Sequence, residues 1–142
     1  MRALFDVNLL LALFLPAHVF HDDAEQWFSE NHEFGWSSCA ITENGAVRIL
    51  SQPALGTNLT CAGAIAKIAD AARRTDHSFW PDSISLTDAA IFDQRYILSS
   101  KQITDTYLLG LAAQNKGRLV TFDKGIVLSS VRIAADENLV VL

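Results

Sequence analysis

Residues 3–14 have the sequence ALFDVNLLLALF, in which Asp6 is the one acidic residue and all the others except Asn8 are apolar. This pattern predicts a short apolar strand that ends near Asp6 and passes at once into an apolar helix, which Pro16 ends. An ionised carboxylate at such a place would be costly if it were desolvated without a partner. We therefore expect a positively charged group close to Asp6.

Segments with helical and strand patterns alternate along the rest of the chain. Helices are expected at residues 21–31, 41–51 and 59–74, and a further one begins at Thr104-Asp105 and stops at Gly117. Strands are expected at residues 35–39, 118–122 and 138–142, with a loop or short strand at 77–82. Residues 83–103 are polar and show little periodicity.

Strands separated by helices predict an α/β fold with a parallel central sheet and helices on both faces, because a parallel strand pair needs a crossover connection. The length of 142 residues fits one domain, residues 1–142. Sites in such sheets form beyond the carboxyl ends of the strands. Asp6 and Asp123 both follow an expected strand directly.

Glu43 and Asp105 lie on apolar faces of their expected helices. Apolar residues follow each of them after three, four and seven positions, which is the spacing of an inward-facing stripe. These residues are Ala46, Val47 and Leu50 after Glu43, and Leu108, Leu109 and Ala112 after Asp105. Taken singly, Asp105 could instead cap its helix, and Asp123 could be a turn residue before Lys124.

If Asp6, Glu43, Asp105 and Asp123 meet, each pair of charges repels by about 1 to 4 kcal/mol at about 4 Å. Such a quartet needs a cation, and carboxylate oxygens suit Mg²⁺, with Mn²⁺ as the other candidate.

The net charge of −5 disfavours nucleic acid as a ligand. Without the four carboxylates, 12 acidic residues stand against 11 basic ones, which weakens that objection.

Four stretches resemble the acidic motifs of PIN-domain nucleases in the same order along the chain. They are Leu4-Phe5-Asp6-Val7-Asn8, Ile41-Thr42-Glu43-Asn44-Gly45, Ile103-Thr104-Asp105-Thr106-Tyr107 and Val120-Thr121-Phe122-Asp123-Lys124. Two further sets of residues are similar to VapC-type toxins of bacterial toxin-antitoxin modules. They are the sequence Thr42-Glu43-Asn44-Gly45 with Arg48-Ile49-Leu50, and the residues His21, Ala24 and Trp27 of the expected helix 21–31.

The resemblance implies a three-layer α/β/α domain that hydrolyses RNA with Mg²⁺ or Mn²⁺, forms a homodimer and is inhibited by a cognate antitoxin. The four acidic residues match the catalytic and metal-binding positions of the family. Asn8, Ser37 and Thr104 fall where polar residues support the site. In the expected reaction a water activated by the metal attacks phosphorus, and one carboxylate orients or deprotonates that water.

Two other functions remain open from the sequence. One is a phosphotransferase or phosphatase that is phosphorylated on Asp6; the other is a catalytically silent module on the same fold that only binds a partner.

Neither a disulfide framework nor a zinc site is indicated by Cys39 and Cys61, so we expect free thiols in the cytoplasm. The apolar run at residues 9–15 is too short to cross a membrane.

Overall fold

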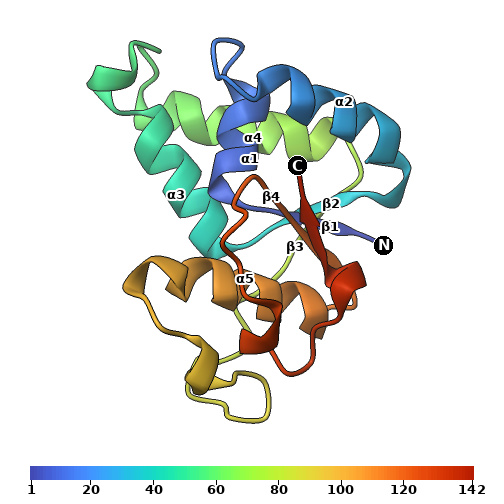
Figure 1. The fold of residues 1–142 in the computed structure, drawn as a ribbon. Coiled ribbons are helices and arrows are strands. Elements are labelled where there is room, and N and C mark those ends of the chain that lie inside the picture. The colour runs from blue at the N-terminus through green and yellow to red at the C-terminus, as the bar shows by residue number, and fades with distance from the viewer.

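The computed structural model describes residues 1–142 and has a five-stranded sheet at its centre (Figure 1). The strand order is β3-β2-β1-β4-β5, and every neighbouring pair is parallel. The strands are β1 (Ala3–Phe5), β2 (Trp36–Ser38), β3 (His77–Phe79), β4 (Arg118–Thr121) and β5 (Leu139–Val141). The predicted parallel sheet is therefore confirmed.

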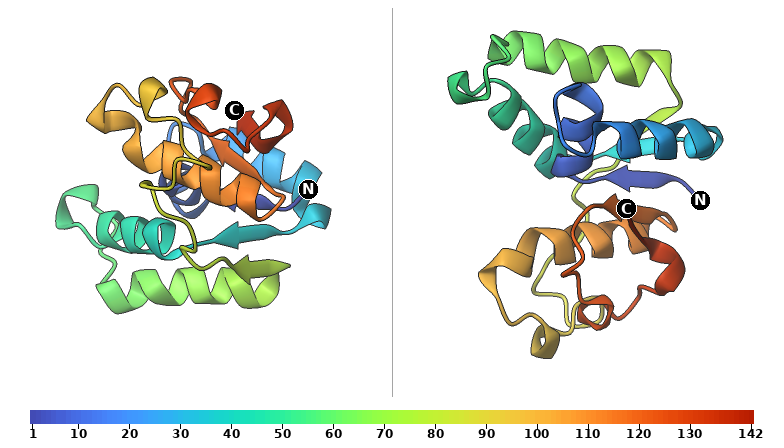
Figure 2. Two further views of the ribbon diagram at one scale, coloured as in Figure 1. Left: turned by 90° about the horizontal axis from the view of Figure 1, so that it is seen from below. Right: turned by 45° about the horizontal axis from the view of Figure 1, so that its top comes forward.

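Helices cover both faces of this sheet, as the sequence predicts. They are α1 (Val7–Phe14), α2 (His21–Asn31), α3 (Ala40–Leu50), α4 (Cys61–Arg74) and α5 (Ile103–Gln114). Helices α1 to α4 lie on one side, and α5 lies on the other with the irregular segments around it (Figures 1 and 2). The result is the expected three-layer α/β/α arrangement.

Alternation along the central strands separates two hydrophobic cores. In β1, Leu4 packs into the core beneath α5, whereas Ala3 and Phe5 pack beneath α1 to α4. In β4, Leu119 and Val120 divide in the same way. Successive strand residues point to opposite faces, so an uninterrupted apolar strand can fill both cores.

An aromatic cluster joins the sheet to α2. The ring of Phe5 stacks on Trp36 at a centroid distance of 5.2 Å, and Trp27 and Phe28 of α2 meet it edge-on at 6.0 and 6.1 Å. Ala24, one turn earlier, is fully buried. The amphipathic pattern of residues 21–31 therefore places its apolar stripe against the sheet.

Several expected boundaries move by one to three residues. Helix α4 begins at Cys61 rather than at residue 59, because the Thr60 hydroxyl caps it by accepting from the Gly63 N–H at 3.0 Å. Helix α5 begins at Ile103 and continues directly from the 3₁₀ helix η4 (Ser100–Gln102), so neither Thr104 nor Asp105 is its N-cap. Asp105 lies in the first turn instead.

The end of α5 differs from the expectation in its chemistry. Lys116, not Gly117, takes the left-handed conformation, with φ of 55°. A Cβ on Gly117 would lie 2.7 Å from the Arg2 carbonyl oxygen and 2.5 Å from the Trp80 ring. Gly117 is therefore needed because the chain approaches its neighbours closely there, and not because of its dihedral angles.

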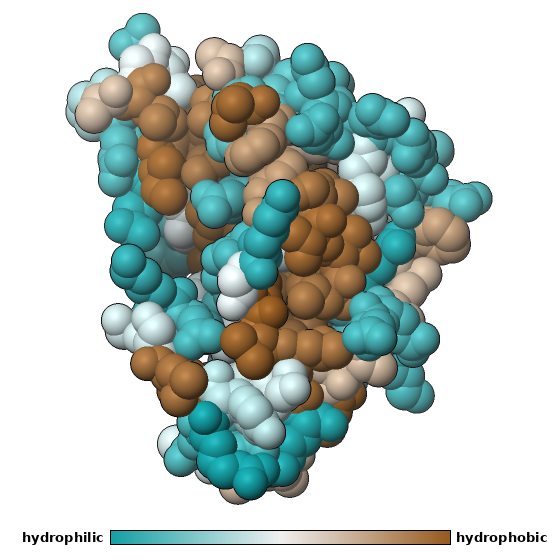
Figure 3. Space-filling model, in the orientation of Figure 1, coloured by the Kyte–Doolittle hydropathy of each residue, from teal (hydrophilic) through white to brown (hydrophobic).

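Strand β5 lies at one edge of the sheet, so one of its sides pairs with no other strand. An apolar area near the centre of the face in Figure 3 lies over this edge, where Val141 is 40% exposed. No helix in the structure combines the length and the apolar composition that crossing a membrane requires.

Two helical glycines give a matched test of the α5 packing. A Cβ on Gly110 would lie 2.6 and 2.7 Å from ring atoms of the buried Phe92, whereas one on Gly63 would meet nothing closer than 3.3 Å. Gly110→Ala should therefore lower the free energy of unfolding by about 1 to 3 kcal/mol. Gly63→Ala should raise it by about 0.5 to 1 kcal/mol through helix propensity. Urea unfolding measures both, and an equal gain in stability would show that α5 does not pack as described.

Candidate active site

Asp6 joins β1 to α1 and is held by donors from two elements. It is the N-cap of α1, and its Oδ1 accepts from the Leu9 N–H at 2.7 Å. Its Oδ2 accepts from the Thr121 hydroxyl at 2.6 Å, which ties the end of β1 to the end of β4. The residue is only 4% exposed. Burial raises the pKa of Asp6, and the hydrogen bonds from Thr121 and Leu9 offset part of that rise.

Asp123 follows β4 and approaches the same place through Thr121. The Asp123 N–H donates to the Thr121 oxygen at 2.9 Å, so one hydroxyl serves both aspartates. The Asp123 Oδ1 accepts from the Gly125 N–H at 2.7 Å, which closes a turn after the strand. The negative charge of Asp123 contributes to the raised pKa of Asp6.

Asp105, in the first turn of α5, is the third carboxylate near this edge of the sheet. Burial is the largest cause that raises its pKa from 3.8 to about 6, followed by a hydrogen bond with Asp123 and the charges of Asp123 and Asp6. Asp105 and Asp123 line a small pocket of about 90 Å³. We call Asp6, Asp105 and Asp123 the aspartate cluster.

Glu43 stands apart from the aspartate cluster. It lies in the first turn of α3, and its Oε1 accepts from the Ser38 hydroxyl at 2.5 Å. His77 of β3 contacts the same hydroxyl at 2.8 Å. No hydrogen bond in the structure joins Glu43 to one of the three aspartates. The structure thus brings three of the four acidic residues together, and the place of Glu43 as a fourth ligand stays a prediction.

The three supporting residues expected from the sequence make few side-chain contacts here. Asn8 and Thr104 are exposed, and Asn8 affects Asp6 through its backbone N–H. The Ser37 hydroxyl is buried and has no hydrogen-bond partner. The hydroxyls that do contact the acidic residues belong to Ser38 and Thr121, which the sequence analysis did not select. The supporting position could have been inferred only for Thr121, which ends β4 two residues before Asp123.

The donor set of the aspartate cluster fits a hard divalent cation. It offers carboxylate oxygens only, and burial raises the pKa of both Asp6 and Asp105, an effect that a nearby cation would oppose. No set of three or more histidine, cysteine, aspartate or glutamate side chains is arranged to hold a metal ion in this structure. The fit therefore rests on the chemistry of the donors.

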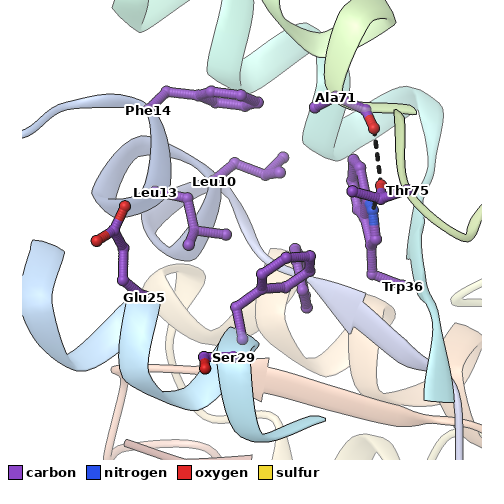
Figure 4. A pocket seen from close by; sticks show the side chains of 10 residues that line it. Leu10, Leu13, Phe14, Glu25, Ser29, Trp36, Ala71 and Thr75 are labelled. Atoms are coloured by element: carbon purple, nitrogen blue, oxygen red, sulfur yellow. Dashed lines mark hydrogen bonds between the residues drawn. The ribbon is translucent and has the colours of Figure 1, made fainter. Parts of the chain in front are cut away.

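A second hollow, apolar rather than acidic, lies on the other face of the sheet. It has a volume of about 390 Å³ and is enclosed by α1, α2 and α4 (Figure 4). Its lining includes Leu10, Leu13, Phe14, Phe28, Trp36 and Ala71, with Glu25 and Ser29 at one side. Glu25 is the one ionisable side chain in its lining, so the three aspartates do not contribute to this pocket.

Relatives of known name cover nearly the whole chain. Ribonuclease VapC44 of Mycobacterium tuberculosis is 45% identical over 142 residues, which is 100% of both chains. Ribonuclease VapC39 of the same organism is 41% identical over 127 residues, 89% of this chain and 91% of that protein. Ribonuclease VapC38 is 37% identical over 125 residues, 87% and 86%. No protein-family model matches the chain.

The burial of Asp105, together with the neighbouring carboxylates of the aspartate cluster, predicts a pH dependence of stability in chelator. Asp105 has a pKa of about 6 in the folded protein against 3.8 ordinarily, so the folded state binds more protons between these values. Stability should therefore fall as the pH rises from about 4 to about 6. The full effect would be about 3 kcal/mol, which half-exposure reduces to about 1 kcal/mol. Melting temperatures measured across this range test it.

Asp105→Asn should make that pH profile flatter and should raise the melting temperature at pH 7. The matched control is Asp136→Asn, because Asp136 is exposed and makes no side-chain hydrogen bond. This control should keep the slope of the wild-type protein. Identical profiles for Asp105→Asn and wild type would mean that neither burial nor the neighbouring carboxylates raise the pKa of Asp105.

Proposed function

The chain belongs to the VapC family of ribonucleases, and from this membership we propose that it is an endoribonuclease that acts as the toxin of a toxin-antitoxin pair. The observation that carries the proposal is the aspartate cluster, in which Asp6, Asp105 and Asp123 lie at the carboxyl edge of the sheet, near enough that the charges of Asp6 and Asp123 act on Asp105. This edge is where α/β folds place their sites. The substrate is RNA, and the bond hydrolysed is its phosphodiester linkage.

We further propose that the three aspartates hold Mg²⁺ or Mn²⁺, with Glu43 as the fourth acidic residue. A bound ion of this kind supplies positive charge for the phosphate oxygens and makes a nearby water more acidic. Carboxylates that repel one another in the free protein become mutually compatible next to a cation. The poorly compensated charges of Asp6 and Asp105 support this assignment.

The hydrogen bonds suggest a division of roles among the aspartates. Both oxygens of Asp6 accept hydrogen bonds, so its carboxylate is fixed in direction. Asp105 receives no hydrogen bond from a backbone N–H or a hydroxyl, and apart from its hydrogen bond with Asp123 its oxygens can accept from a water. We therefore assign Asp105 the role of orienting the attacking water and Asp6 the role of a fixed ligand.

The same geometry weighs against the aspartyl-phosphate alternative. A nucleophilic Asp6 would have to free one oxygen from the Thr121 hydroxyl or from the Leu9 N–H. It would also have to emerge from a position where it is 4% exposed. A role as a fixed ligand keeps both hydrogen bonds, whereas formation of an acyl-phosphate would turn one of these acceptor oxygens into an ester oxygen, which accepts hydrogen bonds poorly.

An exposed lysine at the pocket favours an anionic substrate despite the net charge of −5. Lys101, from η4, lines the pocket that holds Asp105 and Asp123. It forms no ion pair with either carboxylate. We propose that it meets a phosphate of the RNA beside the bond that is cleaved.

Association with other proteins is a further part of the proposal. The apolar pocket between α1, α2 and α4 and the apolar area at the β5 edge support a cognate antitoxin and a homodimer as partners (Figures 3 and 4). Cys39 and Cys61 are both free, which agrees with action in the reducing cytoplasm.

Cleavage of cellular RNA by the purified protein tests the proposed reaction. Discrete products should form with Mg²⁺ or Mn²⁺ and should be absent in chelator. Asp105→Asn and Asp6→Asn should lower the rate by about 100-fold or more, because each removes a charge that acts on the reacting groups. Asparagine at position 6 still caps α1, so the fold is retained.

Asp136→Asn is the control for these variants and should cleave like the wild type. Full cleavage by a folded Asp105→Asn protein would refute the assigned site. Equal cleavage with chelator would refute the metal while leaving the ribonuclease in place. Formation of an acyl-phosphate on Asp6, trapped and identified by mass spectrometry, would favour the phosphotransferase instead.

A further inference from the structure

Ser38 joins two side chains that lie far apart in the sequence. Its hydroxyl contacts Glu43 Oε1 at 2.5 Å and His77 Nε2 at 2.8 Å. Ser38 is fully buried at the end of β2, whereas Glu43 and His77 are half-buried. The serine therefore connects the first turn of α3 to the edge strand β3.

The number of protons fixes the direction of both hydrogen bonds. A serine hydroxyl has one proton, and a carboxylate can only accept. The Ser38 proton is therefore donated to Glu43, and the serine oxygen accepts a proton from His77 Nε2–H. Neutral and protonated imidazole can both supply this N–H. A hydroxyl that accepts one hydrogen bond becomes a stronger donor in the next.

His77 itself is held in place by its surroundings. Its ring lies on Trp36 at a centroid distance of 4.3 Å, in the paired register of β2 and β3. Next to it, the Arg2 guanidinium donates to the carbonyl oxygens of Trp36 and Asp76 and to the Asp76 carboxylate. The imidazole is thus presented to Ser38 from a fixed strand.

Glu43 has room to move if this connection is lost. It borders a pocket of about 180 Å³ between α3 and α4 whose other lining residues are apolar: Val47, Ile65, Ile68, Ala69 and Ala72. None of these side chains can donate a hydrogen bond to a carboxylate. The Ser38 hydroxyl is the one side-chain donor to Glu43 in the structure.

We propose that His77 is a positioning residue that fixes the Glu43 carboxylate through the Ser38 hydroxyl. The inference deepens the proposed function and rests on it, since it presumes that Glu43 takes part in RNA cleavage. Loss of the connection should allow Glu43 to occupy other rotamers, which reduces the fraction of molecules that are ready to react. The effect should therefore appear in kcat, with KM little changed.

Kinetics with variants test the connection. His77→Ala and Ser38→Ala should each lower kcat about 10-fold, which is the usual scale for residues that orient a metal-site ligand. Their double variant should be about as slow as either one, because both act through one hydroxyl. His77→Gln keeps an N–H at a similar position and should restore most of kcat. His32→Ala is the control, because this exposed histidine contacts only the Ser29 carbonyl.

An unchanged kcat in a folded His77→Ala protein would overturn the proposal. So would a His77→Gln protein that is as slow as His77→Ala, or a drop in kcat that follows the melting temperature across all variants. These last two results would mean that the histidine only stabilises the β2–β3 pair. Failure of the wild-type protein to cleave RNA would instead count against the proposed function.

NMR of the metal-free protein tests the hydrogen bonds without any activity. The imidazole ¹⁵N shifts should show that His77 is protonated at Nε2. The Glu43 side-chain carboxyl ¹³C signal should move in His77→Ala and stay in place in His32→Ala. A His77 tautomer with its proton on Nδ1 alone, or a Glu43 signal that does not respond, would refute the connection even if the protein cleaves RNA.

Discussion

The buried carboxylate of Asp6 is the constraint on which the rest of the site depends. It follows an apolar strand, so the chain carries a charge directly into the interior, where an uncompensated charge is costly. Two hydrogen-bond donors, the Leu9 N–H and the Thr121 hydroxyl, stabilise this charge. Thr121 comes from β4, and this bond brings Asp123 to the same edge of the sheet. The hydrogen bond that stabilises the buried Asp6 carboxylate therefore also brings Asp123 near it.

Local patterns in the sequence predict most of this architecture. Apolar runs and helical spacing depend on near neighbours, so β1, α1, α2 and the order of elements follow from the chain alone. The hydroxyl contacts do not, because Thr121 lies 115 residues from Asp6, and Ser38 lies 39 residues from His77. A strand serine or threonine has the same local pattern whether or not a carboxylate lies beside it.

The choice between Ser37 and Ser38 shows this limit most clearly. A shift of one residue in a strand turns the side chain to the opposite face of the sheet. The sequence Trp36-Ser37-Ser38 contains polar residues in both phases, so the face that meets Glu43 cannot be read from it. In the structure, the Ser38 side chain lies on the same face of the sheet as Trp36 and contacts Glu43, whereas the Ser37 hydroxyl is buried without a hydrogen-bond partner. Pairing with β1 and β3 decides between them.

The acidic residues are held in two different electrostatic states, and this difference is the basis of the proposed chemistry. Burial raises the pKa of Asp6 and of Asp105, and the charges of neighbouring aspartates add to the rise, so negative charge is disfavoured at the place where a cation would stabilise it. Glu43 receives a proton donor instead, and the donor is itself held by His77. Repulsion alone would leave the fourth carboxylate free to turn away from the other three. A hydrogen bond from a buried hydroxyl fixes its direction without adding charge, so cation binding can depend on the aspartates while the orientation of Glu43 is set by the edge of the sheet.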